Sequence, residues 1–164
     1  MVKCYHYCTN EFIEELNDKQ IIYANDIINT ENANYVKNYV FKEKKLNKGN
    51  GMFFTWTHPD YKGPIKYDEK GKYSLVELEV PENIAIKTNY ENWCSFQVDL
   101  DEANGNLELA DKICREDYGI KDGLLGSYNA IFDLSDTKME IQVLLPYIDL
   151  KWVKSTKNVH RRYI

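Results

Sequence analysis

Three polar residues near the two ends of the chain have side chains suited to nucleotide chemistry. His6 lies in an N-terminal segment of alternating character that predicts a strand, with Val2, Cys4 and Cys8 on the same face. Glu140 and Gln142 lie two residues apart in a late segment of similar pattern. A histidine nitrogen can hydrogen-bond a ribose hydroxyl, and a carboxylate can stabilise an oxocarbenium-like transition state. His6 and Glu140 are therefore candidate catalytic residues, and Gln142 is a candidate ligand-binding residue.

A structural role is the alternative for all three residues. A histidine on a strand is commonly satisfied by hydrogen bonds within a core. Glu140 and Gln142 fall on the outward side of the predicted strand, and we expect that side to be a solvated face if no ligand is bound there.

A second group of side chains supplies rings and hydroxyls that suit a bound nucleotide. Flat rings stack on nucleobases, and polar tips hydrogen-bond sugars. The long, breaker-rich segment 57–73 follows a tryptophan and contains further rings, as functional loops often do. The candidate ligand-binding residues of this group are Tyr7, Thr9, Tyr23, Trp56, His58 and Tyr61. The alternative is that the 13 tyrosines of the chain reflect the coding bias of an AT-rich genome.

We expect no metal site. Cys4 and Cys8 flank His6, but four residues of extended strand separate their Cα atoms by roughly 13 Å. Two thiolates on one zinc ion need sulfurs within about 4 Å of each other. A later acidic run lacks the glycine and spacing of a calcium loop and predicts a solvated face, at Asp99, Asp101, Glu102 and Glu108.

Composition excludes several classes of protein. The net charge of −5 disfavours a strongly basic nucleic-acid binder. No apolar run approaches the roughly 18 residues of a membrane span, and residues 1–10 do not resemble a secretory signal. We therefore expect a cytoplasmic protein with reduced cysteines and no membrane partner. Phosphate-binding and serine-hydrolase glycine motifs are absent, which removes support for kinase, dehydrogenase and hydrolase functions.

The elements expected from the pattern form one α+β domain over residues 1–164. We predict a mixed or antiparallel sheet with a few flanking helices and a basic, flexible tail over 154–164. Strands are predicted at 1–8, 21–23, 52–56, 74–80, 84–87, 139–145 and 148–153. Helices are predicted after a cap at Thr9 or Asn10, after a cap at Thr30, and over 107–118, where Gly119 ends the helix. A helical turn is predicted at 89–96.

From Met52 onward the chain resembles an uncharacterised bacterial family, domain of unknown function 3841. The resemblance covers about two thirds of the chain. It rests on the tryptophan-containing strand at 53–56, LVELEVPE at 75–82, NYENW at 89–93, SYNAIFDL at 127–134 and LKWV at 150–153. The chain departs from the family at its start, where the family tends to open with a tryptophan-containing strand. The family has no activity that the resemblance could imply.

Both ends of the chain also resemble the ADP-ribosyltransferase superfamily. The matching segments are YHYCT at 5–9, before a helix, and EIQVLLP at 140–146. The resemblance implies a nucleotide cleft between the halves of the sheet, with His6 on the NAD ribose, Tyr23 or Tyr61 on nicotinamide, and Glu140 driving transfer. The family's catalytic glutamate falls at Gln142, whose amide carries no negative charge. This departure puts the transferase activity in doubt.

Three functions follow as expectations. The first is transfer of ADP-ribose from NAD to a macromolecule, with NAD as substrate and a protein as target. The second is non-catalytic binding of a nucleotide-type small molecule, such as phage-type sequestration of a nucleotide immune signal, which Gln142 favours. The third is a protein-interaction module that uses the tryptophan and tyrosine surface and binds no small ligand.

Overall fold

The computed structural model describes residues 1–24, 52–59, 72–135 and 141–159, and they adopt an α+β structure. Contacts divide the chain into two compact units. The described residues of unit 1 are 1–24, 52–59, 72–86 and 142–159. Those of unit 2 are 87–135 and 141. The predicted α+β class and antiparallel sheet are confirmed. The helix expected after Thr30 lies outside the described residues.

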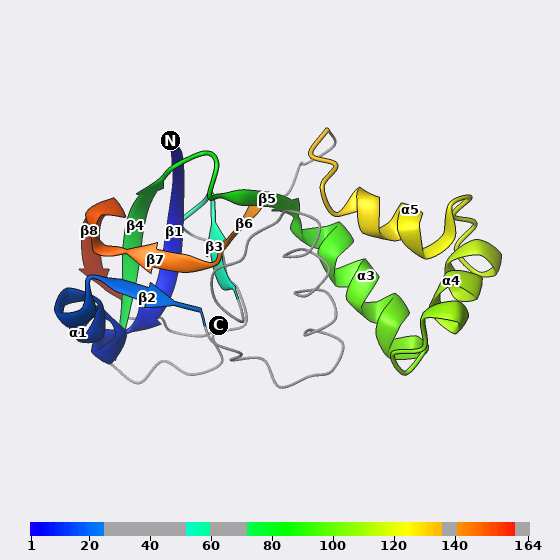
Figure 1. Ribbon diagram of the computed structural model, residues 1–164, viewed down its shortest axis with the longest axis horizontal. Coiled ribbons are helices and arrows are strands. Elements are labelled where there is room, and N and C mark those ends of the chain that lie inside the picture. Colours follow the sequence, from blue (N-terminus) through cyan, green and yellow to red (C-terminus); the bar gives the residue numbers. More distant parts are fainter. Residues whose placement is uncertain (25–51, 60–71, 136–140, 160–164) are drawn as a thin grey trace. The chain divides into compact units, whose positions relative to one another are not determined.

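A six-stranded sheet has the order β5-β6-β3-β1-β4-β8 (Figure 1). The strand β1 pairs with β3 and β4, β3 pairs with β6, and β4 pairs with β8, all antiparallel. Two further strands, β2 and β7, pair separately. The strands are β1 (Val2–Thr9), β2 (Ile21–Tyr23), β3 (Phe53–Trp56), β4 (Tyr73–Val80), β5 (Ile86–Asn89), β6 (Ile141–Leu145), β7 (Tyr147–Asp149) and β8 (Val153–Asn158).

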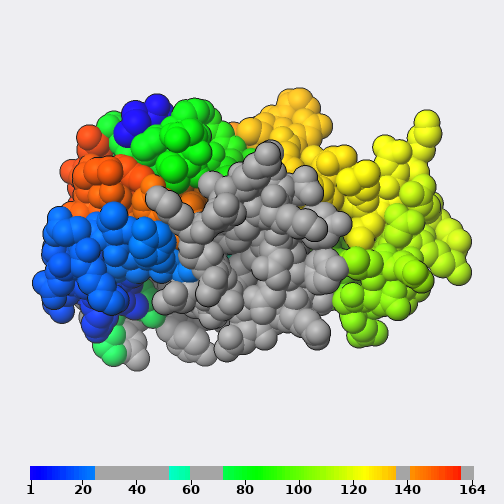
Figure 2. Space-filling model, in the orientation of Figure 1, coloured from blue at the N-terminus to red at the C-terminus, as the bar shows by residue number. Residues whose placement is uncertain are grey.

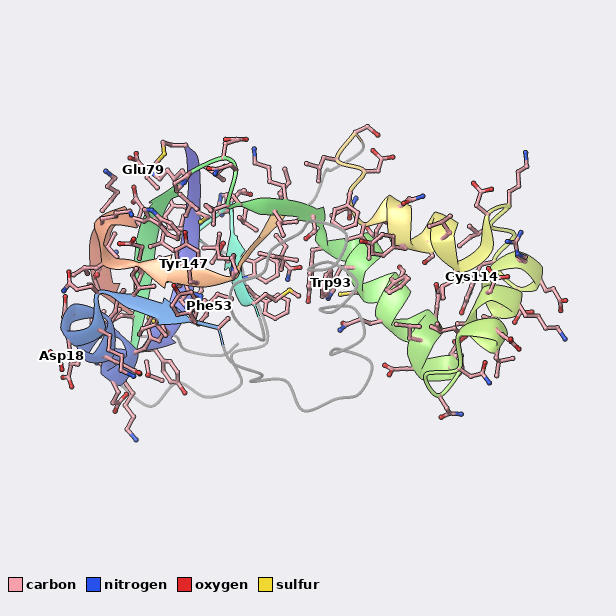
Figure 3. All side chains as sticks on the ribbon, in the orientation of Figure 1. Asp18, Phe53, Glu79, Trp93, Cys114 and Tyr147 are labelled. Carbon is pink, nitrogen blue, oxygen red and sulfur yellow. The ribbon has the colours of Figure 1, made fainter. Side chains whose placement is uncertain are left out.

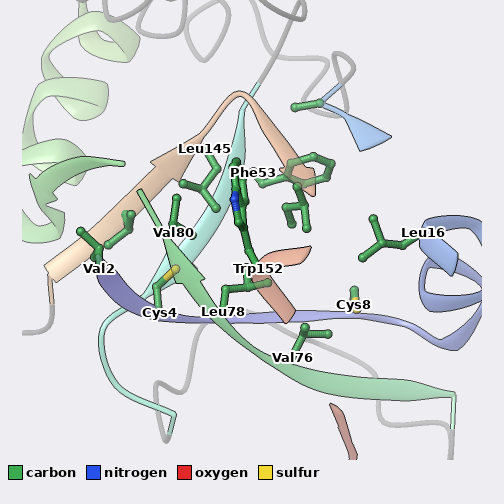
Figure 4. Close-up of a cluster of buried hydrophobic side chains, with 13 residues drawn as sticks. Val2, Cys4, Cys8, Leu16, Phe53, Val76, Leu78, Val80, Leu145 and Trp152 are labelled. Atoms are coloured by element: carbon green, nitrogen blue, oxygen red, sulfur yellow. The ribbon is translucent and has the colours of Figure 1, made fainter. Parts of the chain in front are cut away.

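The core of unit 1 forms on one face of β1 and β4, as the alternation of both segments predicts. Cys4 and Leu78 are opposite each other in the register, and both are fully buried. Figure 4 shows the core side chains of β1 and β4 pointing to the same side, toward Phe53 and Trp152. Burial of these apolar side chains is the main stabilising contribution in this unit.

The helix α1 (Asn10–Lys19) follows β1 directly. Thr9 is its N-cap, and the Thr9 hydroxyl accepts a hydrogen bond of 3.3 Å from the backbone N–H of Phe12. Leu16 is buried, and Phe12 packs against the core. The predicted helix start is therefore confirmed, and its apolar stripe anchors α1 to unit 1.

The end of the chain differs from the single strand predicted over 148–153. It forms β7, a 3-10 helix η1 (Leu150–Trp152) and then β8. The carboxylate of Asp149 begins η1 by accepting a hydrogen bond of 3.0 Å from the N–H of Lys151. Residues 154–158, expected in the tail, lie in β8. This edge strand is almost entirely exposed, so no hydrophobic alternation marks it in the sequence.

Unit 2 contains three described helices, α3 (Tyr90–Glu102), α4 (Leu107–Glu116) and α5 (Gly123–Ala130). Asn89 and Asn106 cap the first two, and each side chain accepts a backbone N–H three residues later. The helix α3 is longer than the turn predicted at 89–96, because buried Phe96 and Leu100 continue the apolar stripe of Trp93. Figure 3 labels Trp93 on α3 and Cys114 on α4.

An ion pair on α4 fixes the start of α5, which the sequence analysis did not predict. Asp111 pairs with Arg115 at 2.8 Å and accepts a hydrogen bond of 2.9 Å from the N–H of Leu124. The φ of Gly123 is +59°, and a Cβ there would lie 1.9 Å from Oδ1 of Asp111. Only glycine lets the backbone approach the carboxylate so closely.

No helix among the described residues is long and apolar enough to cross a membrane.

Candidate ligand-binding pocket

His6 is held by the sheet and by aromatic rings. Its Nδ1 lies 3.1 Å from the carbonyl oxygen of Phe54, so Nδ1 carries the hydrogen and donates it. The ring makes edge contacts with Phe12 and Phe53, at centroid distances of 5.6 and 5.4 Å. Burial lowers the pKa of His6 to about 4, and the bond to Phe54 only partly opposes this. The imidazole is therefore neutral at pH 7.

Gln142 lies on the opposite face of the sheet from His6. In the register Tyr5 is opposite Trp56, and Trp56 is opposite Gln142, so these three side chains share one face. Tyr5 and His6 are adjacent on β1 and point to opposite faces. The structure therefore brings Trp56 and Gln142 together and separates both from His6.

The expected solvated face is wrong for Gln142. The side chain is 2% exposed, and Trp56 is 8% exposed. The strand β6 lies between β5 and β3 and is buried on both faces, as Val143 and Leu144 show. A strand that is covered on both faces buries polar positions that a two-residue alternation assigns to solvent.

Two other candidate residues have structural partners. Tyr7 donates a hydrogen bond from its hydroxyl to the carbonyl of Pro59. Thr9 caps α1, as described above. Both roles hold the chain in place, and neither needs a ligand.

The remaining candidates are two exposed side chains and two residues outside the described part of the chain. Tyr23 is 43% exposed and contacts the ring of Tyr147 at 5.5 Å. His58 is exposed in the segment after β3. Glu140 and Tyr61 lie outside the described residues.

The four cysteines are free thiols, as expected. Burial raises the pKa of Cys4 to about 11 and that of Cys8 to about 12. No group of three or more metal-ligating side chains gathers among the described residues.

A pocket of about 590 Å³ lies within unit 2, between residues of α3, α5 and the segment after α4. On α3 the lining residues include Ser95, Val98 and Asp99, which recur at helical spacing and so share one side of the helix. Ser127 and Gly126 face them from α5. Figure 2 shows α4 and α5, in light green and yellow, at the surface of the molecule.

Asp99 is the buried charged group of this pocket. Its side chain is 4% exposed, and Oδ2 accepts hydrogen bonds from Ser127 Oγ at 2.9 Å and Cys114 Sγ at 3.3 Å. Among the described residues, no group donates a hydrogen bond to Oδ1. The carboxylate therefore has one oxygen fixed by the protein and one able to accept from a molecule in the pocket.

The solvated face predicted for the acidic run is correct for three residues and wrong for Asp99. Asp101, Glu102 and Glu108 are exposed. Asp99 follows the buried Phe96 by three residues and so lies on the apolar stripe of α3. The sequence signal for the pocket is therefore a carboxylate on the apolar stripe of a helix. The structure adds the hydroxyl and the thiol that donate to it.

Carboxylates dominate the electrostatics of the pocket. Burial, followed by the hydrogen bond and charge of Asp99, raises the pKa of Cys114 to about 12. A hydrogen bond to Glu102 at 3.0 Å raises the pKa of Tyr118, and the charges of Asp99 and Asp117 raise it further. Tyr118 and Cys114 therefore remain protonated donors at neutral pH.

One wall of the pocket depends on a second glycine of α5. A Cβ on Gly126 would lie 2.7 Å from Ile120, another lining residue. Val98 and Tyr118 also line the pocket, and each is 49% exposed. The pocket is thus apolar where it meets solvent and polar at Asp99, the combination typical of small-molecule sites.

No protein-family model matches this chain, and neither a curated protein nor a solved structure matches it.

Proposed function

We propose that the chain is a non-catalytic binding protein that takes the base of a nucleotide-type ligand into the pocket between α3 and α5. The observation that carries this proposal is the nearly buried carboxylate of Asp99 in the pocket lining, which has one oxygen fixed by Ser127 and Cys114 and accepts no hydrogen bond from a described residue on the other.

The size and chemistry of the pocket support a ring-bearing ligand. A volume of about 590 Å³ falls within the roughly 300–1,000 Å³ of typical small-molecule sites. The amino group of adenine, guanine or cytosine is an N–H donor, which is the partner that Oδ1 of Asp99 accepts. The half-exposed ring of Tyr118 offers a flat surface for the base.

Two observations favour binding over transfer of ADP-ribose. The transfer of ADP-ribose that the resemblance implies requires a histidine that binds the ribose. His6 instead donates to a strand carbonyl, packs between two phenylalanines and faces away from Gln142. The amide of Gln142 also lacks the charge that departure of nicotinamide requires. The transferase proposal now depends on Glu140, which lies outside the described residues.

The acidic lining favours a nucleoside over NAD in this pocket. Glu91 and Asp99 line it, and no basic side chain does so among the described residues. A diphosphate needs N–H donors or cations around its oxygens. The phosphates of any nucleotide ligand therefore lie outside the described lining.

A protein-interaction module is the second candidate. Four large apolar side chains of unit 2 are exposed, which favours contact with another protein: Val98, Leu109, Tyr118 and Leu125. Such a module leaves the pocket without a small ligand.

A ligand panel tests the proposal. We would titrate the four nucleosides, their monophosphates, NAD, ADP-ribose and cyclic dinucleotides into the protein by calorimetry. Ligand recovered after denaturation is then identified by chromatography. The proposal expects a nucleoside to bind and to return unchanged. Release of nicotinamide or ADP-ribose attached to protein contradicts it and supports transfer, and no binding of any compound favours the interaction module.

Two variants locate the site. Asp99→Asn keeps the size of the side chain but replaces the charged carboxylate with a neutral amide. We therefore expect a dissociation constant at least tenfold higher. Asp101→Asn is the matched control, since it removes the same charge from an exposed position of the same helix. Equal loss in both variants contradicts a site at Asp99.

A further inference from the structure

The charged side chains that line the pocket are all acidic in the part of the chain that the structure describes. Glu91 and Asp99 line the pocket, and Glu102 holds the hydroxyl of Tyr118 at its edge. The cationic Arg115 is already engaged by Asp111 and by the carbonyl of Lys121. An incoming group therefore meets a negative potential.

The carboxylate of Asp99 has little compensation in its own surroundings. Its two donors, the Ser127 hydroxyl and the Cys114 thiol, are neutral groups. Burying a carboxylate next to neutral donors alone leaves much of its lost hydration unreplaced. A positively charged N–H donor at Oδ1 replaces it more fully than a neutral donor, because charge-assisted hydrogen bonds are roughly twice as strong.

We propose that this pocket selects an organic cation, a flat ring that carries a positively charged N–H group and places it on Oδ1 of Asp99. This inference rests on the proposed binding function and adds the charge of the ligand to it. The ring contacts Val98, Ile120 and the face of Tyr118, and a cation beside that aromatic face gains a further attraction.

An organic cation fits the site better than a metal ion. Calcium takes six to eight oxygen ligands and magnesium takes six in an octahedron. The described lining supplies one nearly buried carboxylate, one oxygen of which is occupied by two protein donors. The apolar side chains of the pocket, in contrast, complement a ring.

Two isomeric nucleosides isolate the effect of charge. The base of 1-methyladenosine is a cation at neutral pH and keeps its amino donor, whereas N6-methyladenosine has the same mass and is neutral. Tryptamine and the neutral alcohol tryptophol form a second pair without a sugar. We would measure the dissociation constants of all four compounds by calorimetry at neutral pH and low salt.

The expected result is at least tenfold tighter binding of the cation within one or both pairs. Asp99→Asn is expected to remove that preference, and Asp101→Asn to keep it. Should Asp99→Asn fail to fold by circular dichroism, Glu91→Gln serves in its place, because Glu91 is exposed and lines the same pocket. That variant is expected to reduce the preference two- to threefold.

The outcomes separate this inference from the proposed function. Equal affinity for both members of each pair overturns the inference and leaves nucleoside binding intact. A preference for tryptamine with no binding of nucleosides supports the inference and contradicts the nucleotide proposal. No binding of any of the four compounds, or a preference that Asp99→Asn leaves unchanged, overturns the inference.

Discussion

Buried polar side chains serve different ends in the two units. In unit 1, Thr55 is fully buried and donates to the carbonyl of Val143 at 2.8 Å, and His6 donates to the carbonyl of Phe54. Each donor completes a strand carbonyl. In unit 2, Asp99 lines a pocket and accepts two hydrogen bonds on Oδ2, and no described residue donates to its Oδ1. A polar group with its partners complete stabilises a fold, and one with an acceptor left over marks a binding site.

The difference follows from the secondary structure around each group. Strands bring carbonyls within reach of side chains on neighbouring strands, so Thr55 and His6 find partners in the sheet itself. Helix N–H groups, the backbone donors that a carboxylate needs, are already bonded along the helix. A polar side chain between helices such as Asp99 must therefore use other side chains, or a ligand.

The largest effect is expected at the start of α5, where the backbone approach to Asp111 depends on glycine. Gly123→Ala places a Cβ 1.9 Å from the Asp111 carboxylate at positive φ, so we expect a loss of about 2–4 kcal/mol in the free energy of unfolding. Urea denaturation measures it. Gly119→Ala is the control, since its φ is +66° with no atom within 4 Å, and it should cost about 1 kcal/mol. Equal losses in the two variants would contradict the inference that the close contact with Asp111 makes glycine necessary at position 123.

Thr55→Val tests whether unit 1 uses its buried polar groups for stability alone. Valine keeps the shape of threonine but leaves the Val143 carbonyl without its side-chain donor, which should cost about 1–3 kcal/mol in urea denaturation. Thr55→Ser retains the donor and separates the lost hydrogen bond from packing. Ligand affinity is expected to stay unchanged in Thr55→Val, and a tenfold change would break the distinction between the units.

His6 gives unit 1 a dependence on pH. Because its folded pKa of about 4 lies below the ordinary 6.5, the unfolded chain binds this proton more readily. The contribution of His6 to stability is therefore complete above pH about 6.5 and is lost as the pH falls toward 4. Since the ring is partly exposed, we expect a loss of about 2 kcal/mol over that range.

The variant His6→Gln keeps an amide donor for the Phe54 carbonyl but does not titrate. Denaturation curves at pH 7 and pH 4 should show the wild type losing more stability than the variant. Equal losses would mean that His6 has the same pKa in the folded and unfolded chains, which contradicts its burial as the source of the pH dependence.

The smallest effect is expected at Ser127. Ser127→Ala removes one of the two donors to Oδ2 of Asp99 and leaves Cys114, so we expect a loss of about 1 kcal/mol in stability. Freed from Ser127, the carboxylate is held less firmly, and affinity for a pocket ligand should fall a few-fold. Calorimetry with the tightest ligand found checks this, and unchanged affinity would show that Ser127 does not position Asp99.

Periodic segments of the sequence predict much of the fold. The alternation of 74–80 determines β4 and its buried face, Thr9 marks the start of α1, and Gly119 marks the end of the helix that begins at Leu107. These elements follow from local preferences, because the spacing of apolar residues and the chemistry of a cap act within a few residues. The helix α5 had no such signal, since two glycines interrupt it and its start is fixed by Asp111 on another helix.

The candidate site shows the opposite dependence. Residue types and spacing predicted a ligand-binding or a core role for His6, a ligand-binding or a solvated position for Gln142, and a solvated position for Asp99. The tertiary structure places His6 against a strand carbonyl and buries Gln142 on a strand that is covered on both faces. It places Asp99 in the lining of a pocket. The sequence by itself determined where β1, β4, α1 and α4 form, and that both acidic and aromatic groups are plentiful. The hydrogen-bond partners of these buried polar groups lie 15 to 88 residues away in the chain. Only the folded structure therefore decides which group keeps an acceptor for a ligand.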